Sequence, residues 1–335
     1  MMTDGLSLAS LKATSDFPDA VGPAIIIILP MNDIGPNKVI TLISPVKKRK
    51  LNSRDVDSIT AALLATGIEV IGHKWLSMSE ACDLFFTRGE MAQAKAALLK
   101  NLAGEEIDFI VQPAAKRKKK MLISDMDSTM ISVECIDELA DFAGLKEKIA
   151  AITEKAMQGE LNFEESLRER AQMLKGLSES LLEKAYRERV KFTPGGRALV
   201  QTMKKNGAFC LLVSGGFTFF TAKVRDALGF DADHANILEI ENGTLSGKVK
   251  EPILGKEAKL DFLLSYGRKH GLEMPEILAV GDGANDLPML LGAGLGVAYH
   301  AKPKVKEQAH VKIDVCDLTA LLYAQGYHAE EIVNY

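Results

Sequence analysis

Two carboxylates placed two positions apart, Asp125 and Asp127, lie at the end of a short apolar run that begins at residue 121. The run predicts a buried strand whose last residue is Asp125, with Asp127 in the turn beyond it. Open parallel sheets bind ligands beyond the carboxyl ends of their strands, where backbone N–H groups are free to meet an anion. Held there, one carboxylate can attack an electrophile while the other handles a proton. The same spacing is common in solvated loops, so the pair alone does not establish chemistry.

A hydroxyl and two glycines follow a second apolar run, at residues 209–213. Ser214 could hydrogen-bond a phosphate, and Gly215 and Gly216 would let the backbone approach it closely. An ordinary turn after a strand would have the same composition. Lys259 lies near the start of a predicted amphipathic helix, a position where a lysine is usually solvated.

An acidic loop flanked by glycines follows a third apolar run, at residues 277–281. The loop carries Asp282, Asn285 and Asp286. Such a loop suits Mg²⁺, a hard cation that takes one or two carboxylates and keeps several waters. The loop is therefore a candidate magnesium site.

Taken together and in this order, the four segments resemble the motifs of the haloacid dehalogenase-like phosphatases. That family has DxDx(T/V), then Ser or Thr, then Lys, then GDxxxD, and all four are present here. The resemblance implies a covalent phosphoryl transfer in which Asp125 attacks the phosphorus. Asp127 would protonate the leaving alkoxide and then activate the water that hydrolyses the aspartyl-phosphate.

The resemblance also implies roles for the remaining motif residues. Mg²⁺ would be held by the Asp125 carboxylate, the backbone carbonyl of Asp127, and Asp282. The charge of the transferring phosphoryl group would be neutralised by Ser214, the Gly215 N–H, Lys259 and Asn285. Asp286 would lie behind these groups and orient Lys259 or a metal-bound water.

Residues 134–191 are rich in Ala, Leu, Glu, Lys and Arg at helical spacing, with breaks at Gly159 and Gly176. They predict a small helical insert, which matches the cap of these phosphatases. Two stretches within it resemble the phosphoserine phosphatase family. By that resemblance Glu134 would pair with the ammonium of phosphoserine, and Arg168 would bind its α-carboxylate. Alternatively, Glu134 caps a helix and Arg168 lies on a solvated face.

Residues 37–113 predict a smaller α+β module. Strands are expected at 39–44, 69–76 and 107–112, helices at 55–65 and 91–102, and a further strand or turn at 82–88. This order suits a ferredoxin-like fold and resembles the ACT-like domain that bacterial phosphoserine phosphatases often carry. Effector binding, homodimerisation and a purely structural role all stay open for it.

The chain therefore divides into an N-terminal extension at 1–36, an ACT-like domain at 37–113, a basic linker at 114–120 and a phosphatase core at 121–335. We expect the core to be a doubly wound parallel sheet with flanking helices, carrying the helical cap and a β-hairpin at 238–249. With 335 residues and 47% apolar residues, the chain can form more than one sizeable core. Residues 24–30 predict a strand or a packed extension, too short to span a bilayer.

Composition argues against several other classes of protein. The formal net charge is -4, and the basic runs at 47–50 and 116–120 contain no aromatic residues. We interpret both runs as solvated loop and linker rather than nucleic-acid contacts. The four cysteines are widely spaced with no CxxC pair, which favours a reduced cytoplasmic protein without a zinc site. No secretory signal or membrane segment is predicted.

The sequence thus predicts a Mg²⁺-dependent phosphoserine phosphatase, the enzyme of the last step of serine biosynthesis. One alternative is a phosphatase or phosphotransferase acting on another small phosphomonoester, such as phosphohomoserine or phosphothreonine. Another is a regulatory amino-acid-binding protein in which the ACT-like half is the functional part.

Overall fold

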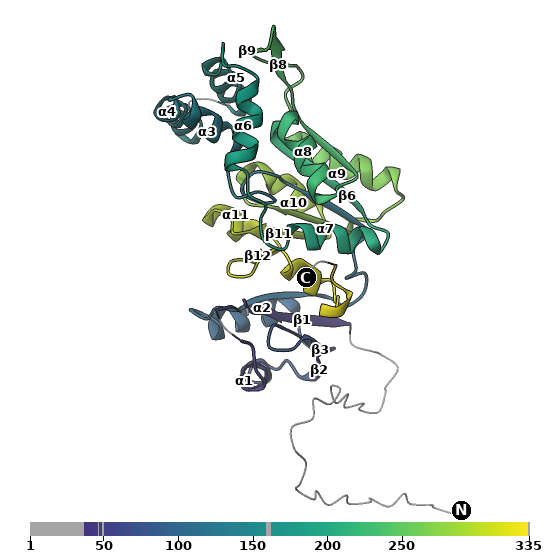
Figure 1. Cartoon of the computed structure of the whole chain (residues 1–335). Coiled ribbons are helices and arrows are strands. Elements are labelled where there is room, and N and C mark those ends of the chain that lie inside the picture. The colour runs from purple at the N-terminus through teal and green to yellow at the C-terminus, as the bar shows by residue number, and fades with distance from the viewer. Residues whose placement is uncertain (1–36, 46, 49, 159–161, 334–335) are drawn as a thin grey trace, which may run out of the picture.

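The computed structural model describes residues 37–333 except residues 46, 49 and 159–161. The strand or packed extension predicted at 24–30 lies outside the described residues. Figure 1 shows three parts in a row: a small α/β unit after the N-terminal segment, a central α/β core, and a group of helices with a hairpin at the far end. Among the described residues, no helix combines the length and the apolar character that crossing a membrane requires.

The N-terminal unit is a four-stranded antiparallel sheet with two helices on one face. Its strands run in the order β2-β3-β1-β4, and the chain order is βαββαβ. This confirms the ferredoxin-like, ACT-like fold, and the segment near residue 82 is a strand. The elements are β1 (Lys38–Ile43), α1 (Ser53–Leu64), β2 (Val70–Ser77), β3 (Ala81–Phe86), α2 (Met91–Asn101) and β4 (Asp108–Pro113).

Helix α1 illustrates why the local sequence folds this way. Asn52 caps its first turn by accepting hydrogen bonds from backbone N–H groups, and the Asp55 carboxylate accepts one from the Asn52 N–H. Val56, Ile59 and Leu63 are buried at helical spacing, so one face of α1 packs on the sheet. The helix therefore begins at a local capping signal and is held by tertiary packing.

The core contains a six-stranded sheet in the order β12-β11-β10-β5-β6-β7, with every neighbouring pair parallel. Both faces are covered: Leu122 belongs to one apolar cluster and Met121 and Ile123 to another. This two-sided burial explains the uninterrupted apolar runs in the sequence and confirms the doubly wound fold class. The strands are β5 (Met121–Ser124), β6 (Phe209–Phe217), β7 (Ala232–Asn236), β10 (Ile277–Gly281), β11 (Leu295–Tyr299) and β12 (Val311–Ile313).

Strand order reverses between β5 and β10, because the chain runs from β5 to β6 and β7 on one side and adds β10 on the other. Ligands of doubly wound folds bind at such a switch point. The core helices are α7 (Gly196–Lys205), α8 (Thr218–Leu228), α9 (Lys256–Lys269), α10 (Leu287–Gly292), α11 (Pro303–Gln308) and α12 (Ala320–Ala324).

The far end of the molecule carries the predicted helical insert and the hairpin, which lie together in Figure 1. Helix α5 packs against β9, so the insert and the hairpin form one surface above the core. The elements are α3 (Cys135–Phe142), α4 (Lys146–Gln158), α5 (Phe163–Met173), α6 (Ser180–Arg189), β8 (Leu238–Glu241) and β9 (Thr244–Val249).

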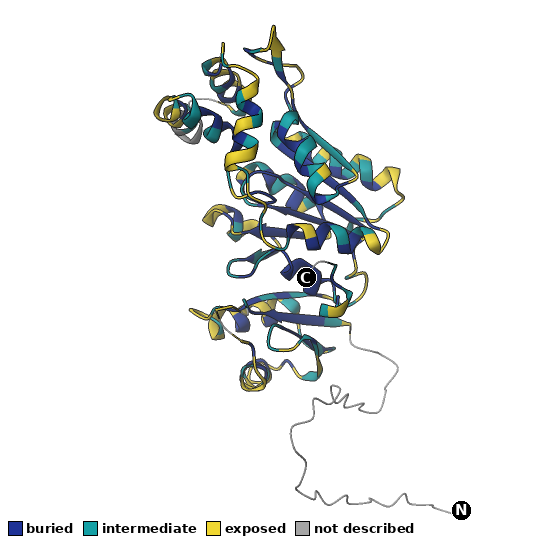
Figure 2. Ribbon diagram, viewed as in Figure 1, coloured by how far each residue is buried: buried dark blue, intermediate teal, exposed yellow. Residues whose placement is uncertain are grey.

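The N-terminal unit is firmly attached to the core. The sheet face not covered by its helices packs on α12, and Ile43, Ala81 and Ile110 belong to the same apolar cluster as the core. Figure 2 shows this junction as a dark, buried zone between the two units. Because the junction is packed like an interior, the open face of the small sheet is not a free surface.

The interpretation of residues 116–120 as a solvated linker is wrong for two of its side chains. Arg117 donates to Asp83 at 2.6 Å and to Thr41 at 3.0 Å. Lys119 is 7% exposed and donates through Nζ to the carbonyl oxygens of Lys116 and Pro275. A basic run has the same sequence signature whether it lies in solvent or bonds acceptors at a domain junction, so composition could not separate the two.

Candidate active site

Strands β5, β6 and β10 are neighbours, and their carboxyl ends open into a cavity of about 690 Å³. Asp125 directly follows β5 and donates its backbone N–H to Val280 of β10 at 3.0 Å. The cavity is lined by most of the residues that the sequence predicted. These are Asp125, Asp127, Glu134, Ser214, Gly215, Asp282 and Asn285.

Asp127 is oriented by two hydrogen bonds. One carboxylate oxygen accepts from the Cys135 backbone N–H at 3.0 Å, and the other accepts from the Ser214 hydroxyl at 3.1 Å. Burial raises the pKa of Asp127, against the hydrogen bonds from Cys135 and Ser214, which lower it. A carboxyl whose pKa is raised holds a proton more readily than an ordinary aspartate, which suits a group that gives and takes a proton.

Gly216 makes this arrangement possible. A Cβ at this position would lie 2.9 Å from Asp127 Oδ2 and 3.0 Å from Ser214 Oγ, so any side chain here would displace the Asp127 carboxylate. The Gly216 N–H donates to the Ser214 hydroxyl at 2.8 Å. Pairing of β6 with β7 is interrupted between Val213 and Phe217, so residues 214–216 turn toward the cavity. The predicted close approach of backbone is therefore built into β6 itself.

Lys259 joins two of the acidic residues beneath the cavity. Its Nζ lies 2.7 Å from Asp125 Oδ1 and 2.5 Å from Asp286 Oδ1, and the side chain is 2% exposed. Burial lowers the pKa of Lys259, but the charges of Asp125 and Asp286 outweigh it and hold that pKa above its ordinary value. Lys259 is thus a buried cation rather than a solvated helix residue.

Asp286 is fully engaged by its neighbours. Besides Lys259, it accepts hydrogen bonds from the backbone N–H groups of Asp282 at 3.1 Å and Gly283 at 2.9 Å. The preceding Gly281 must lack a side chain, because a Cβ there would lie 2.5 Å from Asp286 Cγ. Asp286 therefore fixes both the lysine and the acidic loop.

Three carboxylates, those of Asp125, Asp282 and Asp286, offer oxygen atoms within 4.8 Å of one another and form a candidate metal site. Burial and the charge of Asp286 raise the pKa of Asp125 well above its ordinary range, and the same causes raise that of Asp282 to about 6. The single positive charge of Lys259 cannot neutralise the negative charges of these three carboxylates. Their oxygen chemistry and unbalanced charge fit a hard divalent cation.

Glu134 is the N-cap residue of α3, yet its side chain makes no capping hydrogen bond among the described residues. Instead its carboxylate accepts from the Ser128 hydroxyl at 2.7 Å, and the residue lines the cavity. Although Glu134 is exposed as a residue, partial desolvation of its carboxylate by the surrounding protein and the charge of Asp127 raise its pKa to about 7. A cation entering the cavity would find an acceptor here.

The structure does not bring Arg168 to the cavity. Its guanidinium is exposed and forms ion pairs with Glu251 at 2.8 Å and with Glu164 at 3.1 Å, one turn earlier on α5. The predicted contact with a bound carboxylate therefore has no geometric basis at this position, and the solvated-face alternative describes Arg168 better.

Arg170, two residues further on, lines the cavity in its place. It shares a face of α5 with Phe163, Ser166 and Leu167, at positions i, i+3, i+4 and i+7. Burial lowers the pKa of Arg170, while the charges of Asp137 and Glu134 raise it. The helical spacing from Phe163 was the sequence signal that could have selected Arg170.

Two further residues of the site were given no role in the sequence analysis. Thr129 donates to Asp282 at 3.1 Å and so ties the first motif to the acidic loop. Lys302, at the start of α11, lines the cavity, and its backbone N–H donates to the Asp282 carbonyl at 3.3 Å. Thr129 is the last residue of the first motif, whereas Lys302 belongs to none of the four motifs.

Comparison with known proteins agrees with this geometry. The family model for haloacid dehalogenase-like hydrolases matches residues 122–291. A phosphoserine phosphatase from Polaromonas sp. (strain JS666 / ATCC BAA-500) is 50% identical over 208 residues, which cover 61% of this chain and 88% of the relative.

Two solved structures are similar over different shares of the chain. One is the unliganded form of a probable phosphoserine phosphatase from Vibrio cholerae, with 32% identity and a TM-score of 0.70, covering 86% of that chain and 87% of this one. The other is a phospho-aspartyl intermediate analogue of a phosphoserine phosphatase, with 40% identity and a TM-score of 0.57, covering 98% of that chain and 62% of this one.

Proposed function

The chain belongs to the phosphoserine phosphatases of the haloacid dehalogenase-like hydrolase family, and we propose that it hydrolyses O-phospho-L-serine to L-serine and phosphate through an aspartyl-phosphate. The observation on which this proposal depends is that two carboxylates, Asp125 and Asp127, line one cavity but have different hydrogen-bond partners. Asp125 bonds a buried lysine, whereas Asp127 is held by a hydroxyl and a backbone N–H. Such a difference in surroundings separates a nucleophile from a proton donor.

In the first half of the reaction, the Asp125 carboxylate attacks the phosphorus and the bond from phosphorus to the serine oxygen breaks. Asp127, in its protonated form, gives its proton to that leaving oxygen. In the second half, Asp127 takes a proton from a water molecule, and the water attacks the phosphorus of the aspartyl-phosphate. Phosphate leaves, and Asp125 regains its carboxylate.

The charge of the phosphoryl group must be balanced, because a phosphate monoester repels an anionic nucleophile. The Gly215 N–H lies at the interruption in the β6–β7 pairing and can donate to its oxygens. The Ser214 hydroxyl has a single hydrogen, so it would donate to the phosphoryl group by turning away from Asp127. Asn285, in the loop after β10 on the other side of β5, lines the same cavity. Lys259 adds a positive charge next to Asp125.

The metal is proposed to be Mg²⁺, held by the Asp125 carboxylate, the Asp127 backbone carbonyl, and Asp282. When bound, it supplies positive charge that stabilises the transferring phosphoryl group. Asp286 is assigned the role of orienting Lys259 and the acidic loop, since its oxygens already accept from Lys259 and two backbone N–H groups.

Recognition of the amino acid is assigned to Glu134 and Arg170. Both line the cavity, and each offers one charge of the pair that a small zwitterion requires. Glu134 would accept from the ammonium group, and Arg170 would bind the α-carboxylate with its planar guanidinium. Arg168, which pairs with Glu164 and Glu251, has no role in this assignment.

The insert also covers the cavity. A Cβ on Gly215 would lie 3.1 Å from the ring of Phe163, so α5 reaches across to the end of β6. This contact supports a cap that excludes bulk water while the phosphoryl group is transferred. Opening of α5 away from Gly215 would admit the substrate.

The division into domains is proposed to follow residues 37–113, 114–120 and 121–335. A homodimer formed through the N-terminal domain would have to use its helices or the β2 edge, because the open face of its sheet packs on α12. Size-exclusion chromatography with light scattering tests this oligomeric state.

The proposed function is tested by phosphate release from L-phosphoserine, phosphothreonine, phosphohomoserine and p-nitrophenyl phosphate, each with Mg²⁺ and with EDTA. We expect kcat/KM to favour phosphoserine by about tenfold or more, which corresponds to about 1.4 kcal/mol in the transition state. Equal activity on all four esters would retain the phosphatase and reject the substrate. Serine binding without turnover of any ester would instead favour the regulatory alternative.

A further inference from the structure

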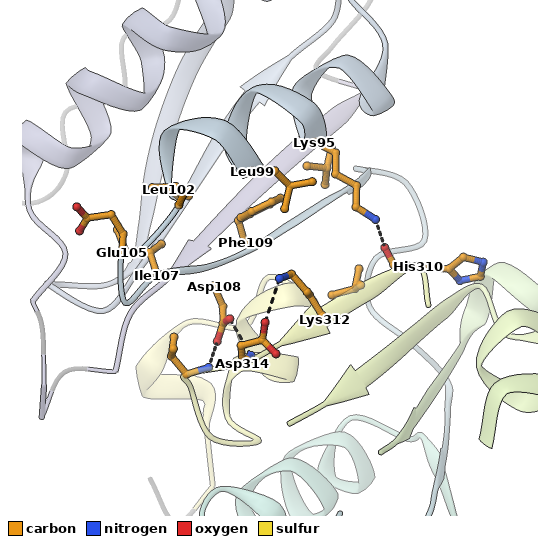
Figure 3. Close-up of a pocket in the computed structure, with 15 residues that line it drawn as sticks. Lys95, Leu99, Leu102, Glu105, Ile107, Asp108, Phe109, His310, Lys312 and Asp314 are labelled. Atoms are coloured by element: carbon orange, nitrogen blue, oxygen red, sulfur yellow. Dashed lines mark hydrogen bonds and ion pairs between the residues drawn. The ribbon is translucent and has the colours of Figure 1, made fainter. Parts of the chain in front are cut away.

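An aspartate of the N-terminal domain holds a loop of the core. Asp108, at the start of β4, accepts hydrogen bonds from three consecutive backbone N–H groups, those of Asp314 at 2.9 Å, Val315 at 3.0 Å and Cys316 at 2.8 Å. Figure 3 shows the Asp108 side chain reaching from its strand to this loop. The carboxylate is 6% exposed, so these are buried, charge-assisted bonds that fix the loop strongly.

The loop in turn holds His300, the residue that follows β11. The His300 Nε2 lies 2.8 Å from the Cys316 carbonyl oxygen, and since a carbonyl only accepts, Nε2 is the donor. The His300 backbone N–H donates to the Ile313 carbonyl at 2.8 Å. His300 has a φ of 43°, in the left-handed region, where a residue other than glycine needs such support from its surroundings.

His300 leads directly into the active site. One residue separates it from Lys302, which lines the catalytic cavity and whose backbone N–H donates to the Asp282 carbonyl at 3.3 Å. The left-handed backbone at His300 therefore determines the direction in which the chain continues to Lys302, which contacts the acidic loop at Asp282.

We propose that Asp108 is a positioning residue for the active site: by fixing residues 314–316 it holds His300, and through His300 it holds Lys302 against Asp282. The ACT-like domain is then part of the catalytic unit, because it supplies one of the groups that keep the acidic loop in register. This inference rests on the proposed function, since its main readout is phosphoserine turnover.

A second buried aspartate of the same domain provides a matched control. Asp83 is 1% exposed and accepts from Arg117 and Thr41. Arg117 also donates to the carbonyl oxygens of Tyr323 and Ala324, at the end of α12. This anchor likewise joins the domain to the core, but it leads to α12 and not to His300.

The experiment compares Asp108→Asn and Asp83→Asn in the full chain, measuring kcat, the KM for phosphoserine, the half-saturating concentration of Mg²⁺ and Tm. We expect Asp108→Asn to lower kcat by between about tenfold and about a hundredfold, as small displacements of catalytic groups do. It should also raise the half-saturating Mg²⁺ concentration. Asp83→Asn should lower Tm while leaving kcat and the Mg²⁺ requirement near those of the wild type.

His300→Asn extends the test to the middle of the connection. Asparagine tolerates the left-handed backbone, so this variant removes the imidazole bond with little change in the turn. We expect it to reproduce the kinetic effect of Asp108→Asn, and the double variant to lose less than the product of the two losses. If Asp108→Asn does not fold, His300→Asn alone decides the question.

Wild-type kcat and Mg²⁺ dependence in Asp108→Asn or His300→Asn, with only a lower Tm, would overturn the proposal and leave Asp108 a structural anchor. An equal kinetic loss in Asp83→Asn would also overturn it, because any weakened junction would then suffice. Failure of the proposed function is distinguishable, since wild-type enzyme would itself not release phosphate from phosphoserine.

Discussion

The Lys259 Nζ lies 2.7 Å from a carboxylate oxygen of Asp125, although 134 positions separate the two residues in the chain. Because one oxygen of Asp125 is held by this lysine, the carboxylate has a fixed orientation, and its second oxygen is left as the candidate nucleophile. Asp286 completes the arrangement by accepting from the same ammonium group at 2.5 Å. In-line attack on the phosphorus requires this fixed orientation of the nucleophile.

Replacing the nucleophile should stop the reaction at its first chemical step. Asp125→Asn keeps the size of the side chain but removes the charge, and we expect kcat to fall by about a thousandfold or more. Phosphoserine binding, measured by isothermal titration calorimetry, should remain detectable because Glu134 and Arg170 are intact. Steady hydrolysis by this variant would exclude Asp125 as the nucleophile.

Two arginines on one helix allow a matched test of substrate recognition. Arg170→Ala should raise the KM for phosphoserine by about tenfold to about a hundredfold, the range expected for a lost charge-assisted hydrogen bond. Its KM for p-nitrophenyl phosphate, which lacks the amino-acid carboxylate, should change little. Arg168→Ala removes exposed ion pairs and should leave both values near wild type.

The opposite result for the two arginines, with phosphoserine KM raised by Arg168→Ala and unchanged by Arg170→Ala, would restore the assignment made from the sequence. An equal loss on both substrates in Arg170→Ala would show that this residue does not bind the carboxylate.

Removing the metal should abolish activity without unfolding the protein. We expect EDTA to suppress phosphate release, excess Mg²⁺ to restore it, and circular dichroism to show the same secondary structure throughout. Mg²⁺ should also raise Tm, because it relieves repulsion among the carboxylates of Asp125, Asp282 and Asp286. Full activity after exhaustive chelation would contradict the assignment of a metal to this site.

Lys119 should make stability depend on pH in the alkaline range. Burial, with help from the charge of Arg117, lowers the pKa of Lys119 from 10.5 to about 8 in the folded protein. Between these two values the unfolded chain holds a proton that the folded protein has lost, so the free energy of unfolding gains a contribution as pH rises. Below about pH 8, burying the ammonium costs stability.

The matched variant for this effect is Lys119→Met, which cannot titrate. Denaturant unfolding from pH 7 to pH 10.5 should show the wild type gaining stability relative to the variant. A constant difference across that range would contradict the lowered pKa.

The catalytic strand ends could be predicted from the sequence because each is a local signal. An apolar run followed by Asp125, Ser214 or Asp282 marks a strand that ends at polar residues, and parallel strands present those ends at one edge. The same reasoning predicted the order of elements in the N-terminal domain, with strand and helix bounds within two residues of those in the structure.

To choose between Arg168 and Arg170, one must know which face of α5 is turned toward the cavity. Two residues apart on a helix means about 200° of rotation, so the two arginines point to opposite sides. The buried hydrogen bonds of Arg117 and Lys119 could not be predicted from the sequence either. The same is true of the connection from Asp108 to His300. The bonds of Arg117 and the connection from Asp108 depend on how the N-terminal unit packs on the core, and Lys119 is buried because its side chain reaches Pro275, 156 positions away.

The most direct test of the central claim is to identify the residue that receives the phosphoryl group from phosphoserine. The enzyme is quenched during turnover of radiolabelled phosphoserine with Mg²⁺, the acyl phosphate is reduced with borohydride, and the modified peptide is located by mass spectrometry. We predict modification at Asp125, and no modification in Asp125→Asn or in the presence of EDTA. Modification at another residue, or none while phosphate is released at the wild-type rate, would contradict this prediction.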